Sequence, residues 1–211
     1  MRKNNQNDEC LICFDKKYKT AYLPDFLIQS DNICQKCRNG FVKDRNTINH
    51  EGFIIEHLYV YNEHFSQLLI QYKELNDEAL APVFIKPYLS YLKNKYRGYV
   101  LVPVPSRQAK IEARGFDHIK LIFSELNLSY SDIFENNAMY DQKGKNLVER
   151  QAIKEHINLC SLSLSQDSKI LIIDDLITTK ATMLACYQLI KNDYKCVKGL
   201  AVAYQKNKER E

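Results

Sequence analysis

The chain has few glycines and prolines, the residues that most often form turns: six of its 211 residues are glycine and five are proline. No glycine is placed to form a Gly-x-x-x-x-Gly-Lys-Ser/Thr phosphate loop, and the pattern Gly-x-Gly-x-x-Gly does not occur. These absences argue against a P-loop nucleotide hydrolase and against the dinucleotide-binding fingerprint.

The sequence also lacks a long apolar run. No segment approaches the about 18 consecutive apolar residues that a membrane helix needs, and residues 1–9 are polar and unlike a signal peptide. We therefore expect a cytoplasmic protein with no membrane insertion. Basic residues exceed acidic ones by 30 to 26, so the net charge of +4 neither requires nor excludes a nucleic-acid partner.

The length suits one main domain with a small appendage. A chain of 211 residues, 45% of them hydrophobic, can bury a substantial core. We place a four-cysteine module at residues 1–45 and the main domain at residues 50–206. The polar run at residues 43–50 is expected to be a linker between them.

Four of the seven cysteines form two Cys-x-x-Cys pairs, Cys10 with Cys13 and Cys34 with Cys37. This spacing is typical of a structural zinc site, because each pair presents two thiolates from one tight turn and two pairs complete a tetrahedral shell. Two disulfides are the alternative, which a cytoplasmic setting disfavours. We predict a structural zinc ion whose binding supplies the folding energy of the module.

Residues 170–182 carry the most informative motif in the chain. Four apolar residues lead into Asp174 and Asp175, and the hydroxyl-bearing Thr178, Thr179 and Thr182 follow at the start of an apolar helix. This order predicts a buried strand, a phosphate-sized loop and a helix N-terminus. Adjacent carboxylates suit two ribose hydroxyls, and threonine hydroxyls beside free N–H groups suit a phosphate. Strands of this kind also occur in parallel sheets that bind no ligand.

Apolar segments elsewhere alternate between strand and helix patterns. Further strands are expected at residues 53–61, 99–104 and 196–204. Helices are expected at residues 65–72, 78–95, 116–126 and 182–190, the second of them kinked or broken near Pro82 or Pro87. This order predicts an α/β fold with a mainly parallel sheet flanked by helices.

Basic residues follow the strand at 99–104. Arg107, Lys110 and Arg114 come before Gly115, which we expect to open the next helix. Loops at the carboxyl ends of parallel strands often bind anions, and a guanidinium suits pyrophosphate oxygens. A solvated basic loop is the alternative. A second basic segment, residues 142–151, contains Arg150 as a candidate anion contact, with an exposed helix as the alternative.

Residues 170–182 resemble the phosphate loop of the phosphoribosyltransferases, whose signature is an apolar strand, Asp-Asp and Thr-Thr-Gly-x-Thr. Lys180 stands where that family usually has glycine, so it either obstructs the loop or adds a cation to the phosphate site. The resemblance implies that ribose is bound by Asp174 and Asp175, and the 5-phosphate by Thr178, Thr179, Lys180, Ala181 and Thr182.

Across the whole chain, the motifs resemble the ComF family of bacterial competence proteins, in which a four-cysteine knuckle precedes a phosphoribosyltransferase-like domain of type I. The two Cys-x-x-Cys pairs, Pro-Val-Pro at 103–105, Arg-Gly-Phe at 114–116, Glu-Arg at 149–150 and the Asp-Asp loop stand in the family's order. Asp117 and His118 replace the Asn-Gln that more often follows Arg-Gly-Phe. The resemblance implies pyrophosphate binding by Arg107, Lys110 and Arg114.

Two functions follow from this resemblance. The first is a DNA-uptake factor in natural transformation that binds phosphoribosyl pyrophosphate or a related phosphosugar, contacts single-stranded DNA and works beside a helicase partner. Some of the 14 tyrosines are candidate stacking platforms for bases. The second is an active phosphoribosyltransferase of unknown acceptor, in which magnesium bridges the pyrophosphate and the ribose hydroxyls. No catalytic base stands out, and Lys180 with the zinc module favours the binding role.

Overall fold

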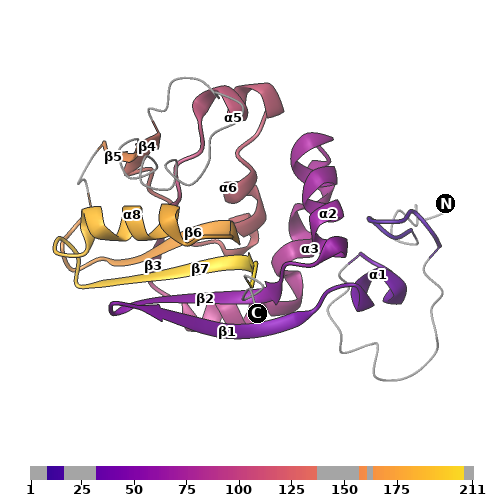
Figure 1. Cartoon of the computed structure of the whole chain (residues 1–211), viewed down its shortest axis with the longest axis horizontal. Coiled ribbons are helices and arrows are strands. Elements are labelled where there is room, and N and C mark those ends of the chain that lie inside the picture. The colour runs from indigo at the N-terminus through magenta and orange to yellow at the C-terminus, as the bar shows by residue number, and fades with distance from the viewer. Residues whose placement is uncertain (1–8, 17–31, 137–156, 161–163, 207–211) are drawn as a thin grey trace, which may run out of the picture.

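The computed structural model describes residues 9–16, 32–136, 157–160 and 164–206. Its centre is a five-stranded sheet ordered β1-β2-β7-β6-β3 (Figure 1). The strands are β1 (Lys43–His50), β2 (Phe53–Val60), β3 (Tyr99–Pro103), β6 (Lys169–Ile177) and β7 (Cys196–Tyr204). Neighbours β2, β7, β6 and β3 run parallel, and β1 pairs with β2 antiparallel. The predicted mainly parallel sheet is therefore confirmed.

Strand β6 lies between β3 and β7 at the centre of the core. Its residues 170–173 have no exposed surface. Parallel strands that are covered on both faces have continuous apolar runs, and this pattern is what identified the strand in the sequence. The strand extends to Ile177, so Asp174 and Asp175 lie within β6 and not at its end.

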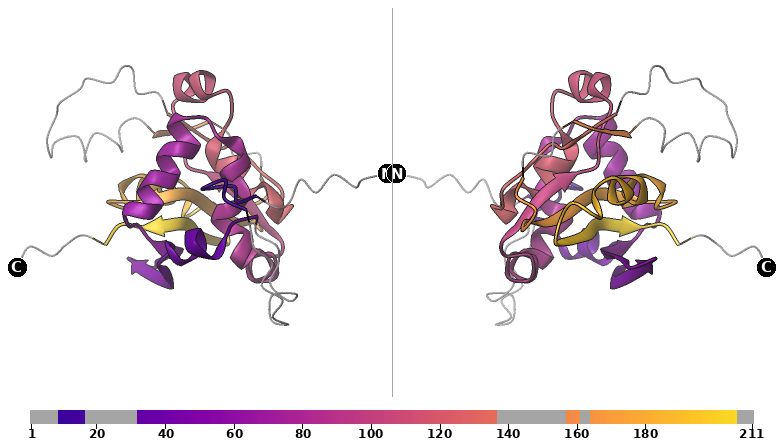
Figure 2. Two further views of the ribbon diagram at one scale, coloured as in Figure 1. Left: turned by 90° about the vertical axis from the view of Figure 1, so that its right-hand side faces the viewer. Right: turned by 90° about the vertical axis from the view of Figure 1, so that its left-hand side faces the viewer.

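Helices cover both faces of the sheet. On one face, Tyr187 of α8 (Ala181–Ile190) stacks on Phe53 of β2 with ring centroids 4.3 Å apart. On the other face, Tyr91 of α4 (Leu89–Lys95) donates a hydrogen bond of 2.8 Å to Glu56 of β2. Because side chains alternate along a strand, Phe53 and Glu56 point to opposite sides. The sheet thus forms the middle layer, with helices on either side (Figure 2).

The remaining helices largely match the apolar periodicity. Helix α2 (Glu63–Glu74) buries the four residues that predicted it, Phe65, Leu68, Leu69 and Tyr72. The broken stretch at 78–95 is confirmed as four short pieces, η2 (Glu78–Leu80), α3 (Ala81–Ile85), η3 (Lys86–Tyr88) and α4. Pro87 lies in η3, where the α-helical hydrogen bonding is interrupted. In the described part of the chain, no helix combines the length and the apolar character that crossing a membrane requires.

The predicted linker at residues 43–50 is wrong, because this segment forms the edge strand β1. Residues 51 and 52 close a two-residue hairpin between β1 and β2, and both have positive φ, 49° at Glu51 and 86° at Gly52. Positive φ at both positions is typical of the type I′ turn, whose twist matches paired strands. An edge strand has a partner on one side only and tolerates polar side chains, which explains its linker-like composition.

The basic segment after β3 also differs from the prediction. Residues 108–114 form a helix, α5 (Gln108–Arg114), and Gly115 ends it with a φ of 85° instead of opening the next helix. Glycine takes this left-handed conformation without a Cβ clash, so it commonly terminates helices. The following α6 (His118–Phe123) begins at a side-chain cap, where Asp117 accepts hydrogen bonds from the N–H groups of residues 119 and 120.

Four small elements complete the described chain, and the first is the 3-10 helix η4 (Ser124–Leu126), which follows α6 directly. Strands β4 (Phe134–Asn136) and β5 (Ile157–Leu159) form a separate antiparallel pair. In Figure 1 this pair lies above α8, on the same side of the molecule as α5. Asn136 donates a hydrogen bond of 3.4 Å to the carbonyl of Pro105, which ties β4 to the segment after β3. Helix α1 (Gln35–Asn39) carries the second cysteine pair and leads into β1.

Candidate functional site

A pocket lies where β6 turns into α8. Its empty volume is about 210 Å³, and it is lined by Asp174, Leu176, Ile177 and residues 178–183. Threonine hydroxyls and the N–H groups at the start of α8 line it, so it suits a small anionic group such as a phosphate. The structure therefore brings together Asp174 and the entire predicted phosphate loop, residues 178–182.

The two adjacent carboxylates have different surroundings. Asp174 is half-buried in the wall of the pocket, where one carboxylate oxygen accepts a hydrogen bond of 2.8 Å from the backbone N–H of Asp175. Asp175 is buried, with 4% of its surface exposed, and is not among the lining residues. Its Oδ2 accepts a hydrogen bond of 2.7 Å from Lys73 Nζ, and its Oδ1 lies 3.7 Å from His118 Nε2. Only Asp174 of this pair faces the pocket.

These surroundings shift the two pKa values in opposite directions. Desolvation and the neighbouring Asp175 carboxylate raise the pKa of Asp174 well above its usual value. Burial alone would raise the pKa of Asp175 as well, but the Lys73 ammonium and the His118 N–H hold it well below its usual value. Asp175 is thus the permanently ionised member of the pair, and its charge disfavours a second charge on Asp174.

Lys180 adopts the backbone conformation that the glycine of the family pattern would take. Its φ is 60°, in the left-handed region, and it is the residue that precedes the first turn of α8. A side chain in this conformation costs about 1–2 kcal/mol relative to the right-handed one. The ammonium lies 6.0 Å from the ring centroid of Tyr204, within cation–π range. The loop therefore holds a residue other than glycine in the left-handed region.

The predicted pyrophosphate residues lie on and beside α5. Arg107 precedes the helix, Lys110 is exposed on it, and Arg114 ends it. Arg114 donates from Nε to the carbonyl of Lys73 and from Nη1 to Nδ1 of His118, both at 2.9 Å. None of the three cations lines the pocket at Asp174. Arg150 and the segment 142–151 lie outside the described residues.

Sequence reasoning missed Lys73 and His118 as neighbours of Asp175. Lys73 is 102 positions from Asp175 in the chain and belongs to no motif. His118 follows Arg-Gly-Phe directly, so its place in that motif was the one available signal. Contacts of this kind depend on how α2 and α6 pack against β6, which periodicity does not reveal.

The four patterned cysteines converge at the N-terminal end of the described chain. The sulfur atoms of Cys10, Cys13, Cys34 and Cys37 all lie within 4.8 Å of one another. A tetrahedral zinc ion with Zn–S bonds of about 2.3 Å would space its sulfurs roughly 3.8 Å apart, and the Cys13 and Cys34 sulfurs are 3.6 Å apart. That distance far exceeds a disulfide bond of about 2.05 Å. The cluster has the donor set and geometry to hold a metal ion such as zinc.

Backbone donors favour a thiolate in this cluster. The N–H groups of Ile12 and Cys34 point at Cys10 Sγ, at 3.4 and 3.2 Å. Burial opposes ionisation, but backbone hydrogen bonds lower the pKa of Cys10 to about 7. Burial and the neighbouring sulfurs raise the pKa of Cys37. Because metal ligands must be thiolates, an ion would have to displace protons from this group.

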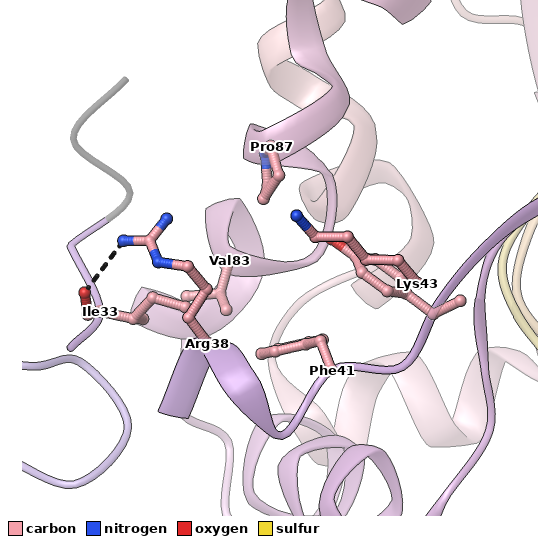
Figure 3. Close-up of a pocket in the computed structure, with 7 residues that line it drawn as sticks. Ile33, Arg38, Phe41, Lys43, Val83 and Pro87 are labelled. Carbon is pink, nitrogen blue, oxygen red and sulfur yellow. Dashed lines mark hydrogen bonds between the residues drawn. The ribbon is translucent and has the colours of Figure 1, made fainter. Parts of the chain in front are cut away.

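The cysteine cluster is joined to the main domain through Gly40. Asn62, which caps α2, donates a hydrogen bond of 2.9 Å to the carbonyl of Gly40. A Cβ at Gly40 would lie 2.5 Å from the ring of His64, so only glycine allows this approach. A second pocket of about 280 Å³ lies at this junction, and Figure 3 shows Arg38 of α1 and Lys43 of β1 on either side of it. The other lining residues are Ile33, Phe41, Tyr59, Val83 and Pro87.

Comparison with known proteins supports the predicted resemblance. No family model matches the chain. The competence protein ComFC of Streptococcus pneumoniae is 27% identical over 192 residues, covering 88% of this chain and 84% of the relative. An adenine phosphoribosyltransferase of Campylobacter jejuni is 32% identical over 120 residues, covering 53% of this chain and 60% of the relative. The resemblance to ComF proteins is thus confirmed over most of the chain.

Solved structures give a weaker match. A hypoxanthine phosphoribosyltransferase of Staphylococcus aureus aligns with 64% of this chain and 68% of its own, at 13% identity and a TM-score of 0.40. A TM-score of this size is too low to support a conclusion.

The opposite environments of the two carboxylates predict opposite effects on stability. At pH 7, Asp174→Asn should unfold at higher urea concentration, with a gain of about 1 kcal/mol, because it removes a disfavoured second charge. Asp175→Asn should lose about 2–4 kcal/mol, because it leaves the partly buried Lys73 without its partner.

The pH dependence of urea unfolding provides the check. The raised pKa of Asp174 means that wild-type stability is lost as pH rises from the unfolded value, about 3.9, through the folded one. The advantage of Asp174→Asn should therefore disappear near pH 4. The lowered pKa of Asp175 contributes stability above about pH 3.9, so the loss in Asp175→Asn should be complete at pH 7. Equal losses in the two variants would contradict this assignment.

Proposed function

We propose that this chain is a competence factor whose pocket at Asp174 binds phosphoribosyl pyrophosphate or a related phosphosugar. The observation that carries the proposal is one pocket that combines a carboxylate with hydroxyl and N–H donors at the start of α8. A phosphate group needs such donors and a favourable helix dipole, and a ribose needs an acceptor for its hydroxyls. The match to ComFC over most of the chain supports the competence role.

The expected ligand contacts follow the shape of the pocket. The 5-phosphate is bound by residues 178–182, through backbone N–H groups and the threonine hydroxyls. Asp174 accepts hydrogen bonds from the ribose hydroxyls, while Asp175, also predicted to bind ribose, acts from behind through its charge. Magnesium would accompany the pyrophosphate, and Arg107, Lys110 and Arg114 on and beside α5 would supply positive charge to it.

The four-cysteine cluster is proposed to hold structural zinc. Its four sulfur donors match the tetrahedral shell of structural zinc sites, and a complete shell leaves no open position for a catalytic water. Zinc would join residues 10–13 to α1, and the Gly40 contacts would then fix this module against α2. The zinc supplies folding energy here and takes no part in a reaction.

The nucleic-acid role rests on the junction between this module and the core. Arg38 and Lys43 line a pocket there together with the aromatic rings of Phe41 and Tyr59. Cations that neutralise phosphates are a feature of single-strand binding sites, and here the contact rests on them because Phe41 and Tyr59 are buried. We propose that incoming single-stranded DNA contacts this face and that a competence helicase is the partner that delivers it.

An active phosphoribosyltransferase of unknown acceptor is the second candidate. The observation that favours it is the match of 120 residues to adenine phosphoribosyltransferase. In such a reaction, magnesium and the basic residues would neutralise the departing pyrophosphate, and the protein would mainly hold the reactants in position. Release of pyrophosphate in the presence of an acceptor would separate this function from simple binding.

The ligand assignment can be tested by calorimetric titration of the zinc-loaded chain with phosphoribosyl pyrophosphate and magnesium. We expect saturable binding that falls about tenfold or more in Asp174→Asn, because the amide replaces one of the two carboxyl oxygens with an NH₂ group that cannot accept from a ribose hydroxyl. The matched control is Asp167→Asn, an exposed aspartate just before β6, at the other end of the strand from the pocket. No binding by the wild-type chain would refute the proposal.

The metal assignment predicts one zinc per chain by elemental analysis. Cys34→Ser should lose the metal and the folded state of residues 10–16 and 32–39, because structural zinc supplies about 10–16 kcal/mol of binding free energy. Cys160→Ser, a change at an exposed cysteine outside the cluster, should keep both. Acidification should release zinc as the thiolates are protonated. Full zinc content in Cys34→Ser would contradict the four-cysteine site.

The nucleic-acid assignment predicts salt-dependent affinity for an unstructured single-stranded oligonucleotide, measured by fluorescence anisotropy. Replacing Arg38 and Lys43 together by glutamine should weaken binding and reduce the slope of log affinity against log salt by up to about 1.4, since each phosphate contact contributes roughly 0.7. The control is glutamine at Lys191 and Lys195, which are exposed elsewhere. An unchanged slope would exclude the junction as the contact face.

A further inference from the structure

The surroundings of Asp175 form a closed ring of four residues that come from four elements. Lys73 of α2 donates from Nζ to Asp175 of β6 at 2.7 Å. Oδ1 of Asp175 lies 3.7 Å from Nε2 of His118 in α6. Nδ1 of His118 accepts a hydrogen bond of 2.9 Å from Nη1 of Arg114 in α5. Arg114 closes the ring by donating from Nε to the carbonyl of Lys73 at 2.9 Å. We call these four residues the Lys73 ring.

The direction of each contact follows from the chemistry of the groups. A guanidinium only donates, so Nδ1 of His118 must accept, and in the neutral imidazole the hydrogen then lies on Nε2, which faces Asp175. The His118 backbone is held independently, because its carbonyl accepts a hydrogen bond of 2.8 Å from the buried hydroxyl of Tyr72. The three hydrogen bonds of the ring are therefore consistent in direction, and across the longer contact of 3.7 Å the Nε2–H of His118 faces the Asp175 carboxylate.

Helix α5 depends on this ring for its position. None of its seven residues is buried, so no apolar side chain of the helix anchors it in the core. In the chain, α5 comes after β3 and ends before Gly115. Figure 1 shows it at the top of the molecule, away from the central sheet. Arg114, its last residue, is the point at which the helix meets both Lys73 and His118.

We propose that Lys73 is a positioning residue that fixes α5 relative to the carboxylates of β6. Its side chain donates to Asp175 and its backbone carbonyl accepts from Arg114. A single residue therefore contacts both β6 and α5. This inference rests on the proposed function, in which α5 supplies the cations for the pyrophosphate and β6 supplies the acceptor for the ribose. Lys73 touches neither ligand group and acts through Asp175 and Arg114.

The ring also explains what residue 118 must provide. It needs one donor for Asp175 and one acceptor for Arg114, which neutral histidine supplies with its two ring nitrogens. A glutamine amide supplies the same pair, with its NH₂ and its carbonyl oxygen. Leucine supplies neither, so His118→Gln and His118→Leu form a matched pair that separates hydrogen bonding from packing.

The test compares Lys73→Met with Lys73→Arg in the full zinc-loaded chain. Lys73→Met keeps the carbonyl but removes the cation, and we expect faster amide hydrogen exchange in residues 108–114 with β6 and β7 unchanged. Affinity for magnesium and phosphoribosyl pyrophosphate should fall about tenfold or more, the effect of losing one hydrogen bond to a charged group. Lys73→Arg, which restores a cation, should recover most of both effects, and the exposed Lys195→Met should resemble the wild type.

The two readouts keep this inference separate from the proposed function. If the wild type binds no phosphoribosyl pyrophosphate, the proposed function fails, and exchange in residues 108–114 still decides whether Lys73 holds α5. If Lys73→Met does not fold, His118→Leu against His118→Gln gives the same comparison, with loss of protection and affinity expected in the leucine variant alone. Wild-type exchange and wild-type affinity in Lys73→Met, or in His118→Leu, would overturn the proposal.

Discussion

The ion pair between Lys73 and Asp175 is the interaction on which the candidate site depends. A carboxylate inside the central sheet must be paired, because an isolated buried charge is far too costly. Lys73 pairs with it, and this pairing also fixes the end of α2 beside β6. With Asp175 ionised and held, the neighbouring Asp174 is left as the member that faces the pocket. The two adjacent aspartates thus differ because Lys73 pairs with Asp175 and leaves Asp174 at the pocket.

Helix α2 lies between the cysteine cluster and Asp175 and contacts both. At its first turn, Asn62 and His64 contact Gly40 at the edge of the cysteine cluster. At its last turn, Lys73 holds Asp175. A helix of twelve residues is about 18 Å long, and its apolar side packs in the core along this length. The two ends of α2 therefore help to position the cysteine cluster and the pocket, respectively.

The loop at residues 178–182 accommodates a lysine at a turn that favours glycine. Lys180 takes the left-handed conformation for which glycine is the usual residue, at a modest energetic cost. The ammonium lies beside Tyr204 at the end of β7, so the added side chain has a place next to the loop. The positive φ, together with the free N–H groups at the start of α8, preserves the features that a phosphate would recognise.

Sequence patterns within short segments predicted most helices and strands of this protein. Only the packing of these elements decided the surroundings of the two aspartates. The continuous apolar run of β6, the helical spacing in α2 and the two cysteine pairs could be identified in the sequence, because each depends on residues close together in the chain. The edge strand β1 and helix α5 were missed, because the first needed a hairpin partner and the second is a short helix with no buried side. The sequence alone predicted a cysteine cluster and an aspartate pair beside a phosphate loop. Tertiary structure decided which aspartate faces the pocket, because Lys73 and His118 reach Asp175 only when α2 and α6 pack beside β6.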